Sequence, residues 1–338
     1  MTSMKYLFID MRDGGDWSLD LMFAGFVKLL GPKNVFDFPN KKKHREWTKD
    51  SKPEWGLERR TLGYTEYNSL VSSSFSDITT NALNGNLTVV LDERIESFLM
   101  YEKLGLYRLK TPVIVIAGHD EFWLQGGIPK LKEMYGERLL HTFIDNVISE
   151  DQLVDDVSLI NLSANFAHYW NKPDVVEKET DICFFGSMSS KDRVRFVNHV
   201  LKNYSHLNLD IFLDNGRNGT DCFLSKAEYF SRMAKSKICL NIGGAAYGRA
   251  FRFYEIPWSG SFMLSQSFEA KQLNPFIDGE HCCYFSDEQK LDELITKMLS
   301  NDFEREKIAK QGREFLIDFH SCESRAKYVL DTVGAKNG

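Results

Sequence analysis

The residues most capable of binding or catalysis lie in one segment, Ser236–Gly260, where a glycine pair is followed by two arginines and a glutamate. The apolar run Ile238–Ile242 predicts a buried strand that leads into Gly243 and Gly244. Glycines in such a turn let a ligand approach the backbone N–H groups closely. The segment therefore predicts a loop that binds an anion at the end of a strand.

A short helix is expected to start near Arg249, and a helix N-terminus favours negative charge. Arg249 and Arg252 are three residues apart and can share one helix face, and two guanidiniums there suit a diphosphate. Phosphate would repel the carboxylate of Glu255, which can instead accept hydrogen bonds from both hydroxyl groups of a ribose. The alternative is an ordinary surface ion pair between Arg252 and Glu255.

A second turn of this kind lies in Phe185–Arg193, where a strand, a glycine, several serines and a helix follow one another. Gly186 and Ser187 predict an anion-binding turn at the helix start, with Lys191 and Arg193 as nearby cations. The alternative is that these polar residues are solvated and only begin the helix. The segment is not a P-loop, because the chain has no GxxxxGK[ST] pattern.

The first half of the chain has two shorter motifs, each directly after an expected strand. His119 and Asp120 follow the apolar run Val113–Ala117. The other motif is the turn Asp13–Asp16, whose two central glycines give room for a ligand or simply cap the next helix. The remaining histidines supply no spacing typical of a zinc site.

Strands and helices alternate along the whole chain, and they must position these motifs. Apolar runs such as Tyr6–Asp10 and Leu87–Leu91 are nearly continuous, which is typical of parallel strands covered on both faces. The pattern predicts two α/β halves joined near the polar stretch Asn171–Thr180. Ligands of such sheets bind beyond the carboxyl ends of the strands, so we expect the site in a cleft between the halves.

The run Arg252-Phe-Tyr-Glu255 resembles the donor-binding motif of the GT-B glycosyltransferases, most closely the group 1 family in its CgeB-like branch. Asp181–Gly186, Asn274–Glu280 and Phe319–Leu330 resemble other parts of the same family, so about half of the chain is matched. The resemblance implies an α/β fold with two Rossmann-like domains facing a central cleft. Residues 1–170 would be the acceptor side, 171–320 the donor side, and 321–338 a C-terminal helix that packs back on the first domain.

The activity that this resemblance implies is transfer of a sugar from a nucleotide-sugar, with a UDP-sugar as first choice, to an unidentified acceptor. The acceptor could be a glycan, a protein or a modified nucleic-acid base, and neither metal nor cofactor is expected. His119 would contact the reacting centre, and Asp120 would orient it or hold the acceptor. Tyr247 stands where the family has the first of two glutamates, which leaves the contact to the donor sugar open. The acceptor side would include Asp13, Gly14, Gly15 and Asp16, and the donor side Gly186, Ser187, Lys191, Arg193, Gly243, Gly244, Tyr247, Arg249, Arg252 and Glu255.

The composition of the chain limits the number of domains, the kinds of ligand and the cellular compartment. The chain has 338 residues, 43% of them hydrophobic, and a net charge of −6, which favours two globular domains and argues against general polyanion binding. The basic loop Lys41–Arg45, with Trp47 and Trp55 nearby, is either solvated or touches a negatively charged acceptor. None of the 6 cysteines forms a CxxC pair, and we expect reduced thiols and a cytoplasmic protein without a membrane span.

Two other functions fit the same residues. A binding module would hold a nucleotide or a glycan without turnover, and the non-acidic Tyr247 is the feature that favours it. A sugar-nucleotide epimerase of similar architecture would convert its substrate without any acceptor. A dinucleotide-dependent dehydrogenase is disfavoured, because no GxGxxG pattern follows the first expected strand.

Overall fold

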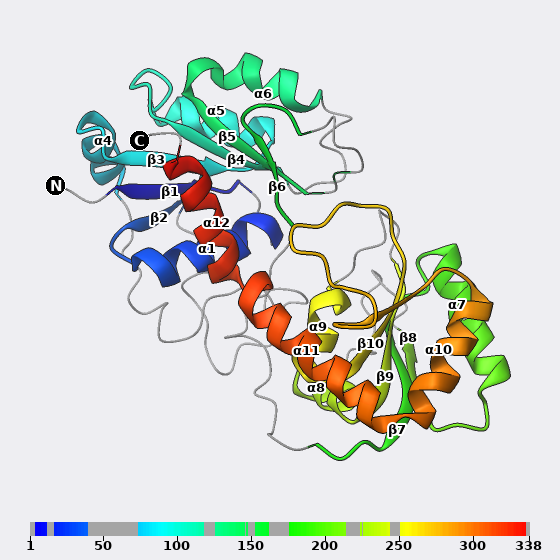
Figure 1. The fold of residues 1–338 in the computed structure, drawn as a ribbon. Coiled ribbons are helices and arrows are strands. Elements are labelled where there is room, and N and C mark those ends of the chain that lie inside the picture. The colour runs from blue at the N-terminus through cyan, green and yellow to red at the C-terminus, as the bar shows by residue number, and fades with distance from the viewer. Residues whose placement is uncertain are drawn as a thin grey trace. The chain divides into compact units, whose positions relative to one another are not determined.

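The protein is described here by a computed structural model, and its described residues fall into two compact units (Figure 1). The first unit comprises the described parts of Met1–His168 together with Lys271–Leu273 and Ser321–Gly338. The second comprises the described parts of Tyr169–Ala270 and Asn274–His320. The structure describes residues 4–11, 17–39, 74–117, 126–145, 147, 153–161, 176–213, 224, 226–243 and 251–335.

The described residues of the first unit form a six-stranded parallel sheet in the order β2-β1-β3-β4-β5-β6. Every residue of β3 and β4 is buried, because helices cover both faces of the sheet (Figure 1). The strands are β1 (Lys5–Ile9), β2 (Val35–Phe38), β3 (Leu87–Leu91), β4 (Val113–Ala117), β5 (Leu139–Ile144) and β6 (Val157–Leu159).

One face of this sheet is covered by α1 (Trp17–Leu30) and the C-terminal helix α12 (Cys322–Gly334). The two helices approach so closely that a Cβ on Gly25 would lie 2.1 Å from the carbonyl oxygen of Cys322. The close approach requires glycine at this position of α1. Phe8 from β1 and Val329 from α12 belong to the apolar cluster that α1 closes.

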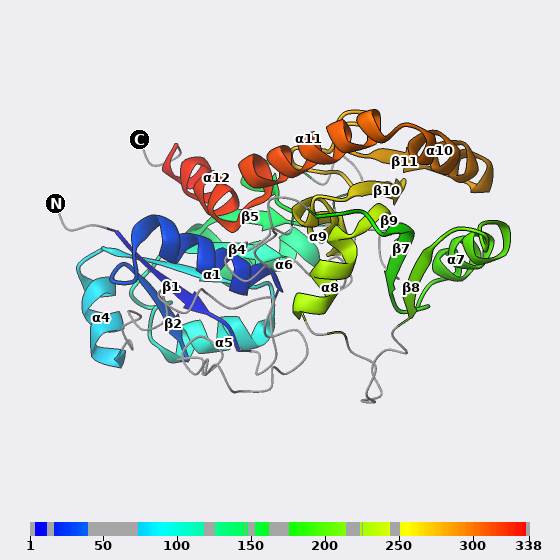
Figure 2. The ribbon, with the colours of Figure 1, turned by 90° about the horizontal axis from the view of Figure 1, so that it is seen from below.

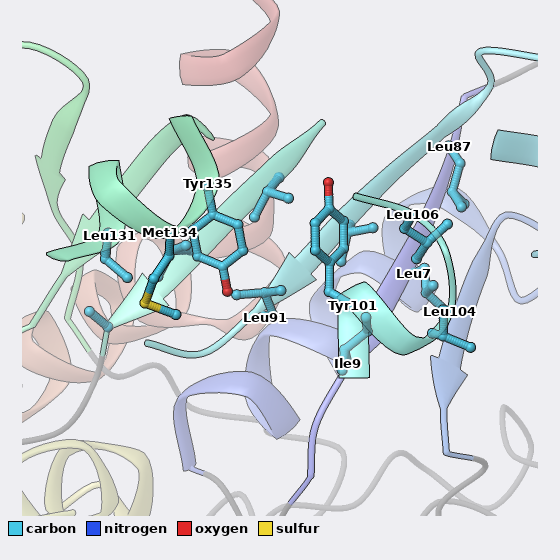
Figure 3. Close-up of a cluster of buried hydrophobic side chains, with 14 of the residues drawn as sticks. Leu7, Ile9, Leu87, Leu91, Tyr101, Leu104, Leu106, Leu131, Met134 and Tyr135 are labelled. Atoms are coloured by element: carbon cyan, nitrogen blue, oxygen red, sulfur yellow. The ribbon is translucent and has the colours of Figure 1, made fainter. Parts of the chain in front are cut away.

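The opposite face is covered by α4 (Phe75–Leu83), α5 (Ile95–Lys103) and α6 (Gly127–Tyr135), followed by the 3-10 helix η2 (Gly136–Arg138). Figure 3 shows this cluster, in which the rings of Tyr101 and Tyr135 lie among leucines and Ile9. The Tyr101 hydroxyl donates a hydrogen bond of 2.6 Å to the Thr111 carbonyl, so its polar atom is satisfied inside the core.

The described residues of the second unit form a five-stranded parallel sheet in the order β11-β10-β9-β7-β8. Helices α7 and α10 pack on one face, and helices α8 and α9 contact β9 from the other (Figure 2). The strands are β7 (Thr180–Gly186), β8 (Leu209–Leu213), β9 (Ser236–Asn241), β10 (Phe262–Gln266) and β11 (Cys283–Phe285). The helices are α7 (Lys191–Asn203), α8 (Lys226–Ala234), α9 (Arg252–Ser259), α10 (Glu288–Ser300) and α11 (Asp302–His320).

The parallel α/β architecture that the sequence predicts is confirmed, and the two closing helices are present as α11 and α12. The sequence pattern missed β5, β6 and β11. Polar residues such as His141 and Thr142 interrupt the apolar run of β5, and the other two strands have only three residues each.

The short helix α9 differs from its prediction at its start. It begins at Arg252, later than the expected start near Arg249, which lies outside the described residues. Pro257 lies within α9, where a proline normally interrupts the hydrogen bonds of a helix. The helix ends soon afterwards, at Gly260 in the left-handed conformation.

Candidate functional site

Three neighbouring strands of the second unit end at one edge of its sheet and bring the candidate site together. β7 ends at Gly186, β9 at Asn241 and β10 at Gln266, and β9 lies between the other two. Helix α7 begins just after β7, and its N-cap Ser190 accepts a hydrogen bond from the Arg193 N–H at 3.2 Å. The carboxyl edge of the sheet thus carries an ordered helix start, the position where α/β proteins bind ligands.

Arg252, from the first turn of α9, is buried at this edge with 8% of its surface exposed. Its guanidinium donates to the Phe185 carbonyl at 2.9 Å and to the Ile242 carbonyl at 3.1 Å, and it lies over the Phe184 ring. A Cβ on Gly186 would lie 2.7 Å from its Nη1 atom. Arg252 therefore joins the ends of β7 and β9, and glycine at 186 makes room for it.

Arg193, from the first turn of α7, is the second buried guanidinium. Its Nη1 atom donates to the Ser187 carbonyl, the Ser187 hydroxyl and the Ser189 hydroxyl at 3.0–3.1 Å. Its Nε atom donates to the Ile242 carbonyl at 3.3 Å. Burial, with a further contribution from the charge of Arg252, lowers the pKa of Arg193 to about 10, so it remains protonated at neutral pH.

The two guanidiniums thus converge on one acceptor, the Ile242 carbonyl oxygen. Like charges brought together in a buried place repel each other, which is why the charge of Arg252 lowers the pKa of Arg193. An anion bound beside them would reverse this cost, because it is attracted by both cations at once. The arrangement is therefore suited to a multiply charged anion such as a diphosphate.

Gly243, the next residue, is held through both of its backbone groups. Its carbonyl accepts a hydrogen bond of 3.0 Å from the Ser190 hydroxyl, and its N–H donates to Gln266 Oε1 at 3.1 Å. The Gln266 amide also donates to Asp192 Oδ2 at 2.6 Å. Side chains from α7 and β10 therefore fix Gly243 in place.

Glu255 lies one turn further along α9 and is 1% exposed. Its Oε2 atom accepts a hydrogen bond of 2.6 Å from the hydroxyl of Tyr229 on α8. The Tyr229 ring in turn packs edge-on against Phe185, with ring centroids 5.6 Å apart. Arg252 and Glu255 are both buried rather than exposed to solvent, so the surface ion pair considered as an alternative is wrong.

The predicted donor-side residues divide into three groups. Those that the structure brings to the carboxyl edge are Gly186, Ser187, Arg193, Gly243 and Arg252, with Glu255 in the following turn of α9. Lys191 is exposed at the start of α7. Gly244, Tyr247 and Arg249 lie outside the described residues, as do His119, Asp120, Asp13, Gly14, Gly15, Asp16, the basic loop Lys41–Arg45 with Trp47 and Trp55, and the first half of the polar stretch Asn171–Thr180.

Four further residues complete the network and were missed by sequence reasoning: Ser190, Asp192, Tyr229 and Gln266. A serine three residues before Arg193 carries the signal of an N-cap, so Ser190 could have been found. The other three have no local signal, since their contacts join residues that are 23 to 74 positions apart.

The carboxyl edge of the first unit's sheet has a different composition. Asp10 follows β1, Asp92 and Glu93 follow β3, and Asp145 follows β5, and all four are buried. A small pocket at the ends of β1 and β2 is lined by Asp10 and by two further aspartates, Asp20 and Asp37. Within the described ranges, no group of three or more histidine, cysteine, aspartate or glutamate side chains could hold a metal ion.

Residues 191–331 match the sequence model of a protein family described as glycosyl transferase-like. No curated protein gives a sequence match to the chain. Among the helices that the structure describes, none is both long and apolar enough to cross a membrane. The two parallel sheets and the solved structures of similar fold define the class of fold: the chain has an α/β fold of the GT-B type.

Solved structures with the same fold include three that cover nearly the whole chain. Anabaena HepE, solved with UDP and glucose, has a TM-score of 0.59 at 9% identity over 98% of this chain and 100% of its own. A glycosyltransferase from Rickettsia africae has a TM-score of 0.62 at 12% identity, covering 99% of each chain. Sucrose-phosphate synthase from Thermosynechococcus elongatus has a TM-score of 0.52 at 11% identity over 98% and 99%.

Proposed function

We propose that the protein transfers a sugar from a nucleotide-sugar donor, with a UDP-sugar as first choice, to an acceptor that carries a nucleophilic group. The observation that carries this proposal is the pair of buried guanidiniums, Arg193 and Arg252, which converge on the Ile242 carbonyl next to Gly243. The glycosyl transferase-like match over 191–331 includes both arginines, and HepE, which shares the fold, was solved with UDP-glucose.

In this proposal the second unit stabilises the leaving diphosphate. When the bond between the sugar and the diphosphate breaks, negative charge develops on the departing phosphate. The two guanidiniums are fixed in place before the reaction, so they stabilise that charge without reorganisation. The N-terminus of α7 adds a further positive dipole end. These groups supply the positive charge that the step needs, so we propose a transfer that does not depend on a metal ion.

The carboxylate of Glu255 is proposed to bind the ribose of the donor. Tyr229 orients this carboxylate through its hydrogen bond, and a carboxylate can accept from two neighbouring hydroxyl groups. From the resemblance we also propose that His119 contacts the reacting centre and that Asp120 orients it or holds the acceptor. Asp13–Asp16 would line the acceptor side, and the protein would belong to the CgeB-like branch.

A cytoplasmic location is proposed from the cysteines. All five described cysteines are free thiols and buried, including Cys183 and Cys239, whose sulfur atoms lie 2.9 Å apart on neighbouring strands. Buried thiols of this kind are typical of a reducing compartment. Cell fractionation with an antibody against the protein tests this location.

The function is tested by incubating the protein with UDP-, GDP- and ADP-sugars and measuring sugar release, transfer and nucleotide binding. The proposal expects binding and slow hydrolysis of one donor, both lost in Arg252→Ala. Arg313→Ala is the matched control. Arg313 lies on α11 rather than α9, and like Arg252 it donates to a main-chain carbonyl of this unit, that of Trp258. Equal activity of Arg252→Ala and wild type would refute the site.

Two outcomes would change the class of function. Nucleotide binding with no turnover in the presence of any acceptor tried would favour a binding module. A changed sugar on an intact nucleotide-sugar, formed without acceptor, would favour an epimerase.

A further inference from the structure

The Gln266 side chain, at the end of β10, bridges two groups that belong to different elements. Its Oε1 atom accepts from the Gly243 N–H at 3.1 Å, and its Nε2 atom donates to Asp192 Oδ2 at 2.6 Å. These partners fix the orientation of the amide, because a backbone N–H can only donate and an ionised carboxylate can only accept. A side chain that both accepts and donates is therefore needed at this position.

Asp192 is the negatively charged group that stands nearest in sequence to the anion-binding arginine Arg193. Both lie in the first turn of α7, where an acidic side chain interacts well with the helix dipole. A carboxylate there would also compete with a diphosphate for the guanidiniums. The hydrogen bond from Gln266 keeps the Asp192 carboxylate bound to the end of β10.

The same amide holds Gly243. Gly243 is fixed on one side by Gln266 and on the other by the Ser190 hydroxyl, and the preceding carbonyl, of Ile242, accepts from both buried arginines. Gln266 thus links Gly243 to Asp192, the acidic residue at the start of α7. A change at this amide would release Gly243 and the Asp192 carboxylate together.

We infer that Gln266 is a positioning residue of the donor site: its neutral amide holds Gly243 in place and keeps the Asp192 carboxylate away from the bound diphosphate. The inference rests on the proposed function, since it assumes that the arginines of this edge bind a nucleotide-sugar. It assigns no direct contact between Gln266 and the donor.

The test is the variant Gln266→Glu, with UDP-glucose as the probe, because each of its two phosphates keeps one negative charge between pH 5 and pH 8. At pH 8 two carboxylates would face each other across the former hydrogen bond, and we expect the Kd to rise about tenfold relative to wild type. Two carboxylates this close share a proton at lower pH. We therefore expect the ratio of the two Kd values to fall towards one at pH 5.

The charge exchange gives the decisive comparison. In the double variant Gln266→Glu with Asp192→Asn, the amide at 192 can donate to the carboxylate at 266, which reverses the direction of the original hydrogen bond. The Kd at pH 8 should therefore return to within about twofold of wild type. Gln289→Glu is the matched control, because it makes the same change of charge at an exposed position of α10. Thermal unfolding of each variant checks that the second unit is folded.

The outcomes separate this inference from the proposed function. If wild type binds UDP-glucose and Gln266→Glu binds it equally well at pH 8, the inference is wrong. A loss that is independent of pH and not restored by Asp192→Asn would also overturn it, because that result indicates a merely structural role. If wild type binds no nucleotide-sugar at all, the proposed function fails and the inference fails with it.

Discussion

The two sheets of this protein share a topology but differ at their carboxyl edges. Both are parallel, and in both the helices that follow the strands begin near that edge. The first unit places Asp10, Asp92 and Asp145 directly after three of its strands. The second unit places two guanidiniums and a glutamine amide at the carboxyl edge of its own sheet, from helices α7 and α9 and from the last residue of β10.

The difference shows that topology provides the location of a binding site while side chains decide its ligand. Helix starts alone would favour anions at both edges. Carboxylates such as those of the first unit disfavour phosphate and can accept hydrogen bonds from hydroxyl or amino groups. Buried arginines in the second unit attract phosphate. The two edges therefore suit different partners, and the following predictions test that contrast.

The largest expected effect is that of Arg252→Ala on donor binding. The variant loses a buried cation that joins β7 and β9, so the Kd for UDP-glucose should rise about a hundredfold, or roughly 2.7 kcal/mol. Arg252→Lys keeps the charge but cannot reproduce the fork of two hydrogen bonds. Its Kd for UDP-glucose should lie between those of wild type and Arg252→Ala. Isothermal titration calorimetry measures the affinities.

The matched variant at the other edge is Asp10→Asn, which should leave the Kd for UDP-glucose within about twofold of wild type, since Asp10 belongs to the first unit and is not part of the proposed phosphate site. If Asp10→Asn weakened nucleotide binding as much as Arg252→Ala, the contrast between the two edges would be wrong.

A smaller effect is expected from Gly186→Ala. The added Cβ would lie 2.7 Å from Nη1 of Arg252 and would displace the guanidinium, so the Kd for UDP-glucose should rise about tenfold and stability should fall by about 1–3 kcal/mol. Gly334→Ala is the control, because a Cβ there would meet no atom within 4 Å. Titration with UDP-glucose and chemical denaturation measure the two effects, and equal behaviour of both variants would contradict the close packing.

Tyr229→Phe should have a weaker effect that depends on the ligand. Loss of the hydroxyl that orients Glu255 should raise the Kd for UDP-glucose about threefold, the size expected for one hydrogen bond. The affinity for a 2′-deoxyribose analogue should change less, because one of the proposed hydroxyl contacts is already missing. An identical change in Kd for both ligands would show that Tyr229 and Glu255 do not bind the ribose.

The smallest effect concerns an ion pair between two helices of the first unit, which takes no part in either sheet edge. Glu323 of α12 accepts from Lys28 of α1 at 2.8 Å. Burial raises the pKa of Glu323, but the hydrogen bonds from Lys28 and Cys322 and the charge of Lys28 outweigh it, so the pKa is lowered overall. A lowered pKa means that the carboxylate stabilises the folded state at neutral pH and that this contribution is lost as the pH falls.

Glu323→Gln should therefore lower the free energy of unfolding by about 0.5 kcal/mol at pH 7, a small value because the pair is partly exposed. The difference from wild type should shrink as the pH falls below the ordinary range of a glutamate, because the carboxylate then becomes protonated in the folded protein as well. Thermal unfolding across this pH range measures the effect, and UDP-glucose binding should not change. A difference that grew towards low pH would show that the sign is wrong.

The apolar pattern made much of the fold predictable. Continuous runs such as Leu87–Leu91 indicated strands buried on both faces, and the structure confirms both the strands and their parallel arrangement. Short or polar strands were not predictable, because β6 and β11 have three residues each and depend on neighbouring strands for their hydrogen bonds. Their existence is a property of the sheet rather than of the segment.

Within the candidate site, the sequence by itself determined the chemical types: glycines at the strand ends, cations at the helix starts and a carboxylate one turn after Arg252. Only the tertiary structure decided how they are used. Arg252, which was expected to contact a diphosphate, donates to the carbonyls of Phe185 and Ile242, and Gln266 gains a role through Gly243 and Asp192. Local patterns report burial and backbone preference, whereas hydrogen bonds between distant residues depend on which strand ends the sheet brings together.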